Sequence, residues 1–185
     1  MRLPGGDFTL NGQDSVMYDG TLSQVQAIQN VASARVWGVQ ADVELSISPD
    51  VQLNSNISFQ EGEEQNPNGP NEPLRHVAPT FGSTHLVIDP GNFTVDIYAD
   101  YNGEIPFSDL APSERGKPHL YANDDNGNPY APSWYTVNIK SSYEISENIS
   151  VNLGLENITD QRYRPYSSGI SAPGRNIIFG LRGSL

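Results

Sequence analysis

The sequence predicts an all-β fold, an antiparallel up-and-down meander of about seven strands. Three observations support it: apolar residues keep to one parity within separate segments, short and long connections alternate, and no helical period interrupts the runs. In residues 36–47 the odd positions are apolar and the even positions between them are mostly polar: Trp37, Val39, Ala41, Val43, Leu45 and Ile47 against Gly38, Gln40, Asp42, Glu44 and Ser46. Strict alternation predicts a strand with one face in an apolar medium and the other in water.

Seven segments are candidate strands: residues 36–47, 51–60, 80–88, 92–102, 133–144, 149–157 and 176–185. Odd positions carry the apolar face in six of them, whereas residues 80–88 alternate too poorly for their faces to be assigned. Short turns near Pro49, Pro90 and Glu147 join three pairs of strands, and Pro suits such turns because no ladder donor is needed there.

The remaining connections, residues 61–79, 103–132 and 158–174, are long, polar and rich in Gly, Pro, Asn and Asp. In an up-and-down barrel every second connection lies on the same side. Outer-membrane barrels have short periplasmic turns and long extracellular loops, whereas a soluble sandwich has no reason to separate loop lengths by end. The pattern therefore favours the wall of such a barrel, with the carboxyl terminus on the periplasmic side and residues 1–35 as an extracellular loop segment.

Aromatic residues on the odd face fall near strand ends, as in the girdles at the two membrane interfaces. Phe93 to Tyr101 spans eight residues, or ~26 Å at ~3.3 Å per residue. With a tilt of about 40° this gives ~20 Å of height, close to the ~25 Å apolar band. We therefore predict girdle positions for six residues, the first four at outer ends and the last two at inner ends: Trp37, Phe59, Tyr101, Tyr135, Phe93 and Tyr143.

Composition narrows the function. The net charge of −12 argues against a nucleic-acid partner, and the absence of cysteine excludes disulfides and thiolate metal sites. No apolar run is long enough for a membrane-spanning helix, so a membrane role would use strands. Residues 1–6 contain no apolar signal segment, so we expect an exported protein to extend upstream of this chain.

No arrangement of residues indicates catalysis. His76, His85 and His119 lack metal-ligand spacing, and residues 123–128 lack the first Asp and distal Glu of a calcium loop. We therefore expect no enzyme activity, no metal site and no cofactor. The candidates for ligand contact lie in or beside the long outer loops: Tyr121, Tyr130, Trp134 and Arg162.

A resemblance to a known family rests on the last two strands. Residues 153–163 read Leu-Gly-Leu-Glu-Asn-Ile-Thr-Asp-Gln-Arg-Tyr, and a loop then leads through Pro173-Gly174-Arg175 into residues 176–182. This resembles the carboxyl-terminal end of TonB-dependent outer-membrane receptors, and residues 34–40 resemble the start of an earlier strand of that family. The resemblance implies a 22-stranded transmembrane β-barrel, plugged by an amino-terminal domain, of which residues 36–185 would form the last seven strands.

The resemblance also implies a function and partners. Such receptors lie in the bacterial outer membrane, contact its lipid, and import a small nutrient such as an iron chelate (a ferric siderophore), haem or cobalamin with energy from the TonB complex. Two departures are the missing plug domain and the final Leu185, where the family usually has an aromatic residue. Seven strands cannot close a barrel of even strand number, so we expect an open, curved sheet.

A different class of protein shares the alternation. In a soluble secreted β-sandwich, such as a carbohydrate-binding or glycosidase domain, the odd faces of two sheets would pack together and paired carboxylates would act in a cleft. The two hypotheses differ in what covers the odd face, which is lipid in the first and protein in the second.

Overall fold

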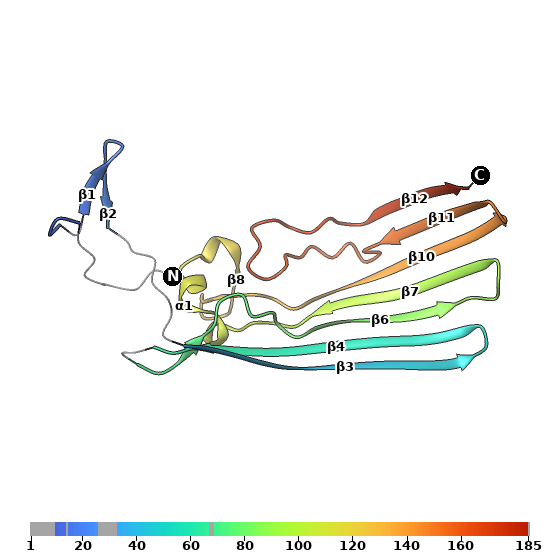
Figure 1. Ribbon diagram of the computed structural model, residues 1–185, viewed down its shortest axis with the longest axis horizontal. Coiled ribbons are helices and arrows are strands. Elements are labelled where there is room, and N and C mark those ends of the chain that lie inside the picture. The colour runs from blue at the N-terminus through green and yellow to red at the C-terminus, as the bar shows by residue number, and fades with distance from the viewer. Residues whose placement is uncertain (1–9, 14, 26–32, 67–68, 185) are drawn as a thin grey trace.

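One antiparallel sheet dominates the computed structural model, which describes residues 10–13, 15–25, 33–66 and 69–184. Its long strands lie side by side in chain order (Figure 1): β3 (Ala34–Ser48), β4 (Val51–Glu64), β6 (Phe81–Ile88), β7 (Phe93–Asn102), β10 (Trp134–Ser146), β11 (Ile149–Glu156) and β12 (Asn176–Gly183). The predicted meander of about seven strands is confirmed, and the expected boundaries hold to within about two residues except that β4 continues to Glu64.

Several smaller elements occupy segments that the sequence predicts as loops. β5 (Glu72–Pro73) pairs with the end of β4, and β8 (Ala122–Asn123) pairs with β9 (Pro129–Tyr130). Three single turns of helix precede β8: η1 (Phe107–Asp109), α1 (Pro112–Arg115) and η2 (Pro118–Leu120). The connections 61–79 and 103–132 are therefore partly ordered by local pairing and helical turns.

The predicted loop segment 1–35 contains a short hairpin of β1 (Ser15–Tyr18) and β2 (Thr21–Gln24). Residues 1–9, 14 and 26–32 of that segment, and Leu185, lie outside the described residues. The extracellular position of the segment stays a prediction.

Strand register places the odd residues of β3, β4, β7, β10, β11 and β12 on one face. β6 joins the same face with its even residues, because Leu86 lies opposite Leu53 of β4 and Ile97 of β7. β6 alternates poorly because residues of the wrong polarity lie on both faces. Gly82 and Thr84 lie on the apolar face, whereas the hydrophobic Phe81 and Val87 lie on the polar face. The sequence alone could not assign these faces.

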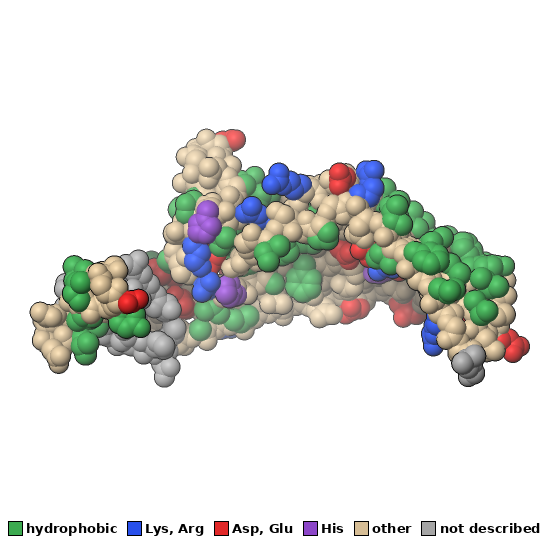
Figure 2. Space-filling view, turned by 90° about the horizontal axis from the view of Figure 1, so that it is seen from above, with side chains coloured by type: hydrophobic (Ala, Val, Ile, Leu, Met, Phe, Trp, Pro, Cys, Tyr) green, Lys and Arg blue, Asp and Glu red, His purple; other side chains and the backbone are tan. Residues whose placement is uncertain are grey.

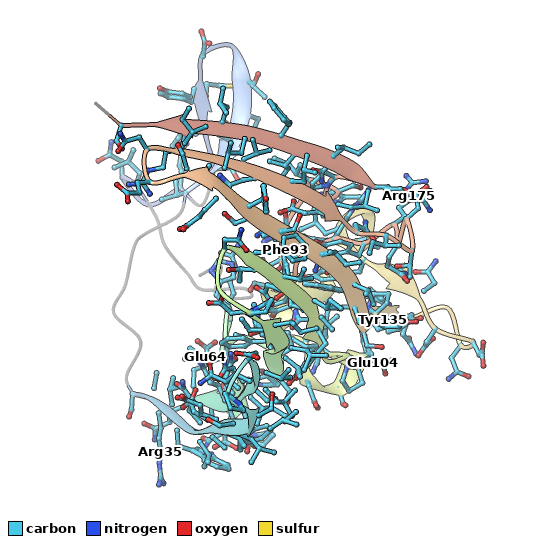
Figure 3. The ribbon with its side chains drawn as sticks, turned by 90° about the vertical axis from the view of Figure 1, so that its right-hand side faces the viewer. Arg35, Glu64, Phe93, Glu104, Tyr135 and Arg175 are labelled. Atoms are coloured by element: carbon cyan, nitrogen blue, oxygen red, sulfur yellow. The ribbon has the colours of Figure 1, made fainter. Side chains whose placement is uncertain are left out.

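No second sheet among the described residues packs over the apolar face of the sheet. Leu153 and Phe179 are 52% and 68% exposed, and the other described sheets are only the two small hairpins. Figure 2 shows hydrophobic side chains gathered on the convex side of the arched molecule near β12, with charged side chains in the hollow below. Figure 3 looks along the strands and shows the sheet as an open arc, with Arg35 and Arg175 toward opposite ends.

The hydrophobic core lies in the loops instead of the sheet. Most of the buried hydrophobic residues lie between β7 and β10, namely Ile105, Leu110, Ala111 and Ala131. The long connections gather at the end of the sheet opposite the tight turns (Figure 1). No helix among the described residues is long and apolar enough to cross a membrane.

Gly82 allows a contact that links three strands. The Tyr101 side chain crosses Gly82 and donates its hydroxyl to the Asn56 carbonyl at 2.9 Å. A Cβ at Gly82 would lie 2.8 Å from the Tyr101 ring and would also overlap the Asn56 carbonyl. We expect Gly82→Ala to destabilise the intact protein by about 1–3 kcal/mol, measured by thermal unfolding.

The matched control is Gly180→Ala, because a Cβ there meets only Asn152 at the ordinary contact distance of 3.6 Å. Equal melting temperatures for the two variants would show that the Tyr101–Asn56 contact does not require a glycine at position 82.

Candidate functional site

The long connections pack on one another around a small apolar cluster at one end of the sheet. Ile105, Leu110 and Ala131 form its centre, and Tyr121 and Tyr166 pack against it. Ile105 and Ala131 also exchange two backbone hydrogen bonds of 2.9 and 3.0 Å. These contacts join the two ends of the connection 103–133 and bring the connection 157–175 against it through Tyr166.

A buried carboxylate ties the same connections together. Glu114, in the single turn α1 that begins at Pro112, has a side chain with no exposed surface. Its Oε1 accepts hydrogen bonds from Arg75 Nε at 2.5 Å and Lys117 Nζ at 2.9 Å. Its Oε2 accepts from the Tyr121 hydroxyl at 2.6 Å and the Ser167 hydroxyl at 3.2 Å. Arg75 and Ser167 come from the connections on either side, so one carboxylate binds three loops.

These hydrogen bonds decide the charge state of the cluster. Burial alone would raise the pKa of Glu114, but the hydrogen bonds from Tyr121, Lys117 and Arg75 outweigh it and lower the pKa from 4.5 to about 2. Burial and the hydrogen bond to Glu114 raise the pKa of Tyr121 above its ordinary value. The carboxylate therefore stays ionised and the phenol stays a donor at neutral pH.

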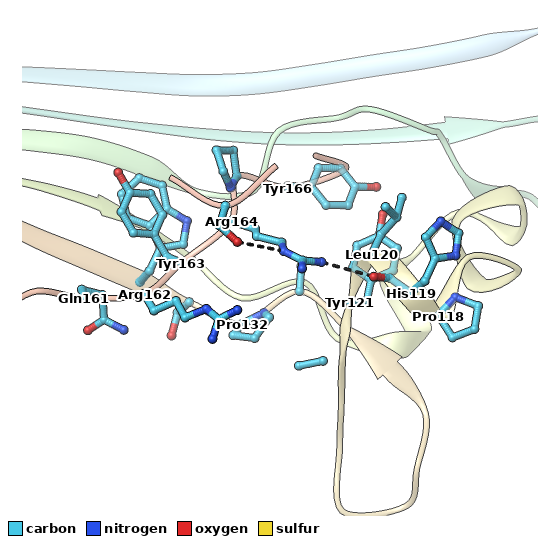
Figure 4. A pocket seen from close by; sticks show the side chains of 16 residues that line it. Pro118, His119, Leu120, Tyr121, Pro132, Gln161, Arg162, Tyr163, Arg164 and Tyr166 are labelled. Atoms are coloured by element: carbon cyan, nitrogen blue, oxygen red, sulfur yellow. Dashed lines mark hydrogen bonds between the residues drawn. The ribbon is translucent and has the colours of Figure 1, made fainter. Parts of the chain in front are cut away.

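A pocket of about 490 Å³ opens beside this cluster, between residues 118–122, 131–134 and 161–171 (Figure 4). Trp134, the first residue of β10, stacks on Tyr163 with ring centroids 4.0 Å apart and 27° between the planes. Tyr121 and Tyr166 form another part of the wall. The pocket thus lies where the loops meet the polar face of the sheet, to which Trp134 belongs by its even position.

Two arginines and a histidine also line the pocket. Arg164 crosses it, donating from Nη1 to the His119 carbonyl at 3.2 Å and from Nε to the Ser171 hydroxyl at 3.4 Å (Figure 4). Arg162 makes no hydrogen bond or ion pair with any of the described residues and is exposed. No Asp or Glu is among the residues that line the pocket.

Three of the four predicted ligand-contact residues meet at this pocket: Tyr121, Trp134 and Arg162. Tyr130 does not line it and lies in β9, paired with Ala122. Their role in binding a ligand stays a prediction. Sequence reasoning missed Tyr163 and Arg164 as pocket residues, although their place within two residues of Arg162 was a usable signal, and it missed Glu114, which no local motif marks.

The six predicted girdle residues lie on the apolar face. Trp37 and Phe59 are in ring contact at 5.4 Å, and Phe93 faces Tyr143 across β7 and β10 at 6.4 Å. Tyr101 is the direct cross-strand partner of Tyr135. Their assignment to membrane interfaces stays a prediction.

The described residues contain no group of three His, Asp or Glu side chains able to hold a metal ion. In the segment 123–128 the Asp124 carboxylate accepts hydrogen bonds from the backbone amides of Asn126 and Asn128 at 2.9 and 2.7 Å. The Asn128 amide is the main cause of a lowered Asp124 pKa. This carboxylate therefore stabilises its own turn.

Comparisons with a protein family and with solved structures indicate the same kind of fold. The family described as "TonB dependent receptor-like, beta-barrel" matches residues 5–158. Solved structures with a similar fold include the copper transporter OprC, with a TM-score of 0.65 at 13% identity over 82% of this chain and 24% of that one. A variant of the ferric enterobactin receptor PfeA from Pseudomonas aeruginosa has a TM-score of 0.63 at 14% identity, covering 84% of this chain and 23% of that one.

The ferric-catecholate import receptor Fiu from E. coli K12 has a TM-score of 0.57 at 18% identity, covering 89% of this chain and 22% of that one. The chain spans about a quarter of the length of the solved structures that it matches. At sequence identities of 13–18%, these three structures show a similar fold and nothing more specific.

The ionised Glu114 predicts an acid-sensitive loop cluster. Because its pKa is lower in the folded state, the stabilisation is complete above about pH 4.5 and is lost as the pH falls toward 2. We expect Glu114→Gln to raise amide hydrogen exchange in residues 103–132 and 158–174 of the intact protein at pH 7. The expected cost is about 1–3 kcal/mol of local stability, because buried donors lose a charged acceptor.

Asp125→Asn is the control, since Asp125 is exposed on the neighbouring hairpin turn. Unchanged exchange in the Glu114→Gln protein, or an equal change in the control, would contradict the assigned role of Glu114.

Proposed function

The chain belongs to the TonB-dependent receptor family, in its β-barrel part, and from this premise we propose that it forms the carboxyl-terminal wall of a receptor in the bacterial outer membrane. The receptor would import a scarce nutrient such as a ferric siderophore, haem or cobalamin. Residues 36–185 would supply the last seven of 22 strands. The family resemblance seen in the sequence is confirmed, and the soluble sandwich hypothesis is set aside.

The observation that carries the proposal is the uncovered apolar face. Its exposed side chains continue across the sheet from Trp37 and Val39 in β3 to Phe179 and Leu181 in β12. A soluble monomer rarely exposes a contiguous apolar surface of this extent, whereas lipid tails would match it. The outer-membrane lipid is therefore the proposed partner of this face.

The opposite face suits a hydrated interior that contacts a plug domain. Polar side chains interact across neighbouring strands there: His85 Nδ1 lies 3.0 Å from the Asp96 carboxylate, and Lys140 Nζ lies 3.5 Å from Glu156 and 4.8 Å from the Tyr98 ring centroid. Charged groups at such positions would be costly in hydrocarbon. In the proposed receptor this face meets water and the plug, through which the TonB complex would act.

The ordered loops would face outward, where nutrient arrives. The loop cluster around Glu114 and the adjoining pocket lie at the end of the sheet away from the tight turns. Two of the similar structures are named for ferric enterobactin and for ferric-catecholate import, which supports an iron chelate as the cargo. This chain would bind the nutrient and help to enclose it. The rest of the receptor would couple import to the energy that the TonB complex supplies.

Adjacent serines on β10 offer a matched test of the two faces. Ser141 belongs to the apolar face, opposite Val95 and Leu153, whereas Ser142 belongs to the polar face, opposite Thr94 and Asn152. We expect Ser141→Lys to cost about 2 kcal/mol of barrel stability, because the ammonium would enter the lipid-facing band. Ser142→Lys should change little. Stability would be measured by denaturant unfolding of the intact receptor in lipid vesicles, and equal costs would contradict the lipid assignment.

Import itself is tested by deleting the gene of the intact receptor. We expect slower growth on one of three sources supplied singly (a ferric siderophore, haem or cobalamin) and recovery when the wild-type gene is returned. A version without the segment that contacts TonB should not restore growth. Unchanged growth on all of these sources would contradict the proposed import role.

A further inference from the structure

We propose that a side-chain clasp sets the register of β12 against β11 and thereby decides how β12 presents its free edge. The clasp consists of Asn157, Asp160 and Arg175, at the base of the connection 157–175. The inference rests on the proposed function only in that β12, an edge of the sheet in this chain, would pair there with a further strand of the receptor.

The residues of β12 do not by themselves specify one register. Because side chains alternate with a period of two, a slip by two residues leaves each of them on its own face. Ile177 and Ile178 are both apolar, although they lie on opposite faces. Three of the eight cross-strand pairs between β11 and β12 contain a glycine, which offers little side-chain contact. The hydrophobic pattern therefore leaves more than one register open.

The connection between the two strands is also too long to fix the register by its length. β10 and β11 are joined by the two residues 147–148, between the paired Ser146 and Ile149, and loop length sets the register of such a hairpin. The connection 157–175 is far longer, and the closure entropy of a long loop changes only slowly with its length. A shift of β12 by two residues therefore costs this loop little.

Asn157 joins the two ends of the connection. It is buried, with 4% of its surface exposed. Its Nδ2 donates hydrogen bonds to the Gln161 carbonyl at 2.9 Å and to the Pro173 carbonyl at 3.2 Å, and its Oδ1 accepts one from the Gln161 amide at 2.9 Å. Pro173 lies just before Asn176, the first residue of β12. One side chain thus ties the end of β11 to the entry into β12.

Asp160 and Arg175 form a second link beside the first. Asp160 Oδ1 accepts a hydrogen bond from the Arg175 backbone amide at 2.9 Å, and Arg175 Nε donates to the Ile158 carbonyl at 2.9 Å. Gly174 allows this approach, because a Cβ there would lie 2.7 Å from Asp160 Oδ1. The two links together place Arg175, and with it the start of β12, at one position relative to the end of β11.

The clasp is built on β10. The Asn157 backbone amide donates to Asn138 Oδ1 at 2.8 Å, and the Ile158 amide donates to the Val137 carbonyl at 2.9 Å. Asn138 is itself buried, and its Nδ2 donates to Thr136 Oγ1 at 3.2 Å. Because the short turn fixes β11 against β10, the clasp positions β12 relative to both strands.

Disulfide trapping measures the register directly. A Cβ at Gly180 would lie 3.6 Å from the Asn152 Cβ, which is a disulfide distance. The intact receptor, otherwise free of cysteine, would carry Asn152→Cys together with Gly180→Cys for the native register. Ile178→Cys or Arg182→Cys would replace Gly180→Cys to detect a slip by two residues in either direction. With the clasp intact, we expect the bond to form with position 180 and not with position 178 or 182.

Asn157→Gly or Asp160→Gly removes one link of the clasp. Glycine retains the left-handed backbone that both residues adopt, with φ of 49° and 53°. Either change should raise the ratio of slipped to native disulfide about tenfold, as expected for one or two lost hydrogen bonds. Gln161→Gly is the matched control, because Gln161 contributes only its backbone to the clasp, and it should leave the ratio unchanged.

An unchanged ratio in both clasp variants, or an equal rise in the control, would overturn the proposal. Where a clasp variant fails to form a barrel, the disulfide between positions 152 and 180 should restore folding, because it fixes the same register. Failure of that rescue would also overturn the proposal. The trapping does not require import, so unchanged growth of the deletion strain, together with the expected disulfide ratios, would overturn the proposed import alone.

Discussion

The structure depends on one constraint: a single-layered sheet that is apolar on one side needs an apolar medium on that side. Hydrophobic side chains of β3 to β12 share this face, and no described segment packs over it as a second sheet. Hydrogen bonding on both sides satisfies the backbone of the five strands between β3 and β12, which is a condition for strands in hydrocarbon. The curvature, the open edges at β3 and β12, and the separation of polar from apolar side chains are all consistent with a segment of barrel wall.

The long connections are ordered in a different way from the sheet. Their order comes from a local core around Leu110 and from the buried Glu114, which binds donors from three connections. A buried charge is stable only when it is paired and hydrogen-bonded, and Glu114 accepts hydrogen bonds from four side chains. The same arrangement fixes the Tyr121 ring beside the pocket and keeps Arg75 and Lys117 out of its lining. Loop order and the position of the Tyr121 ring in the pocket wall therefore have a common origin.

The sheet was predictable from sequence because a period of two is a local signal, as residues 36–47 and 92–102 show. The exception was β6, whose faces depend on pairing with β4 and β7, since Gly82 and Phe81 reverse the expected pattern. The pocket was predictable only in part. Trp134 and Arg162 stood out by type and place, whereas Glu114 acts through partners 39 and 53 residues away, and no local pattern encodes such contacts.

The central claim, that odd residues of the sheet face lipid and even residues face a hydrated interior, is most directly tested on β10. Nitroxide labels would be placed singly at Val137 and at residues 139–143 of the intact receptor in lipid bilayers, avoiding the buried Thr136 and Asn138. Their collision rates with oxygen and with a water-soluble nickel chelate would then be compared. The account predicts a ratio that alternates along the strand, with oxygen favoured at odd positions and nickel at even ones. A ratio without alternation, or nickel favoured at Val137 and Ile139, would contradict it.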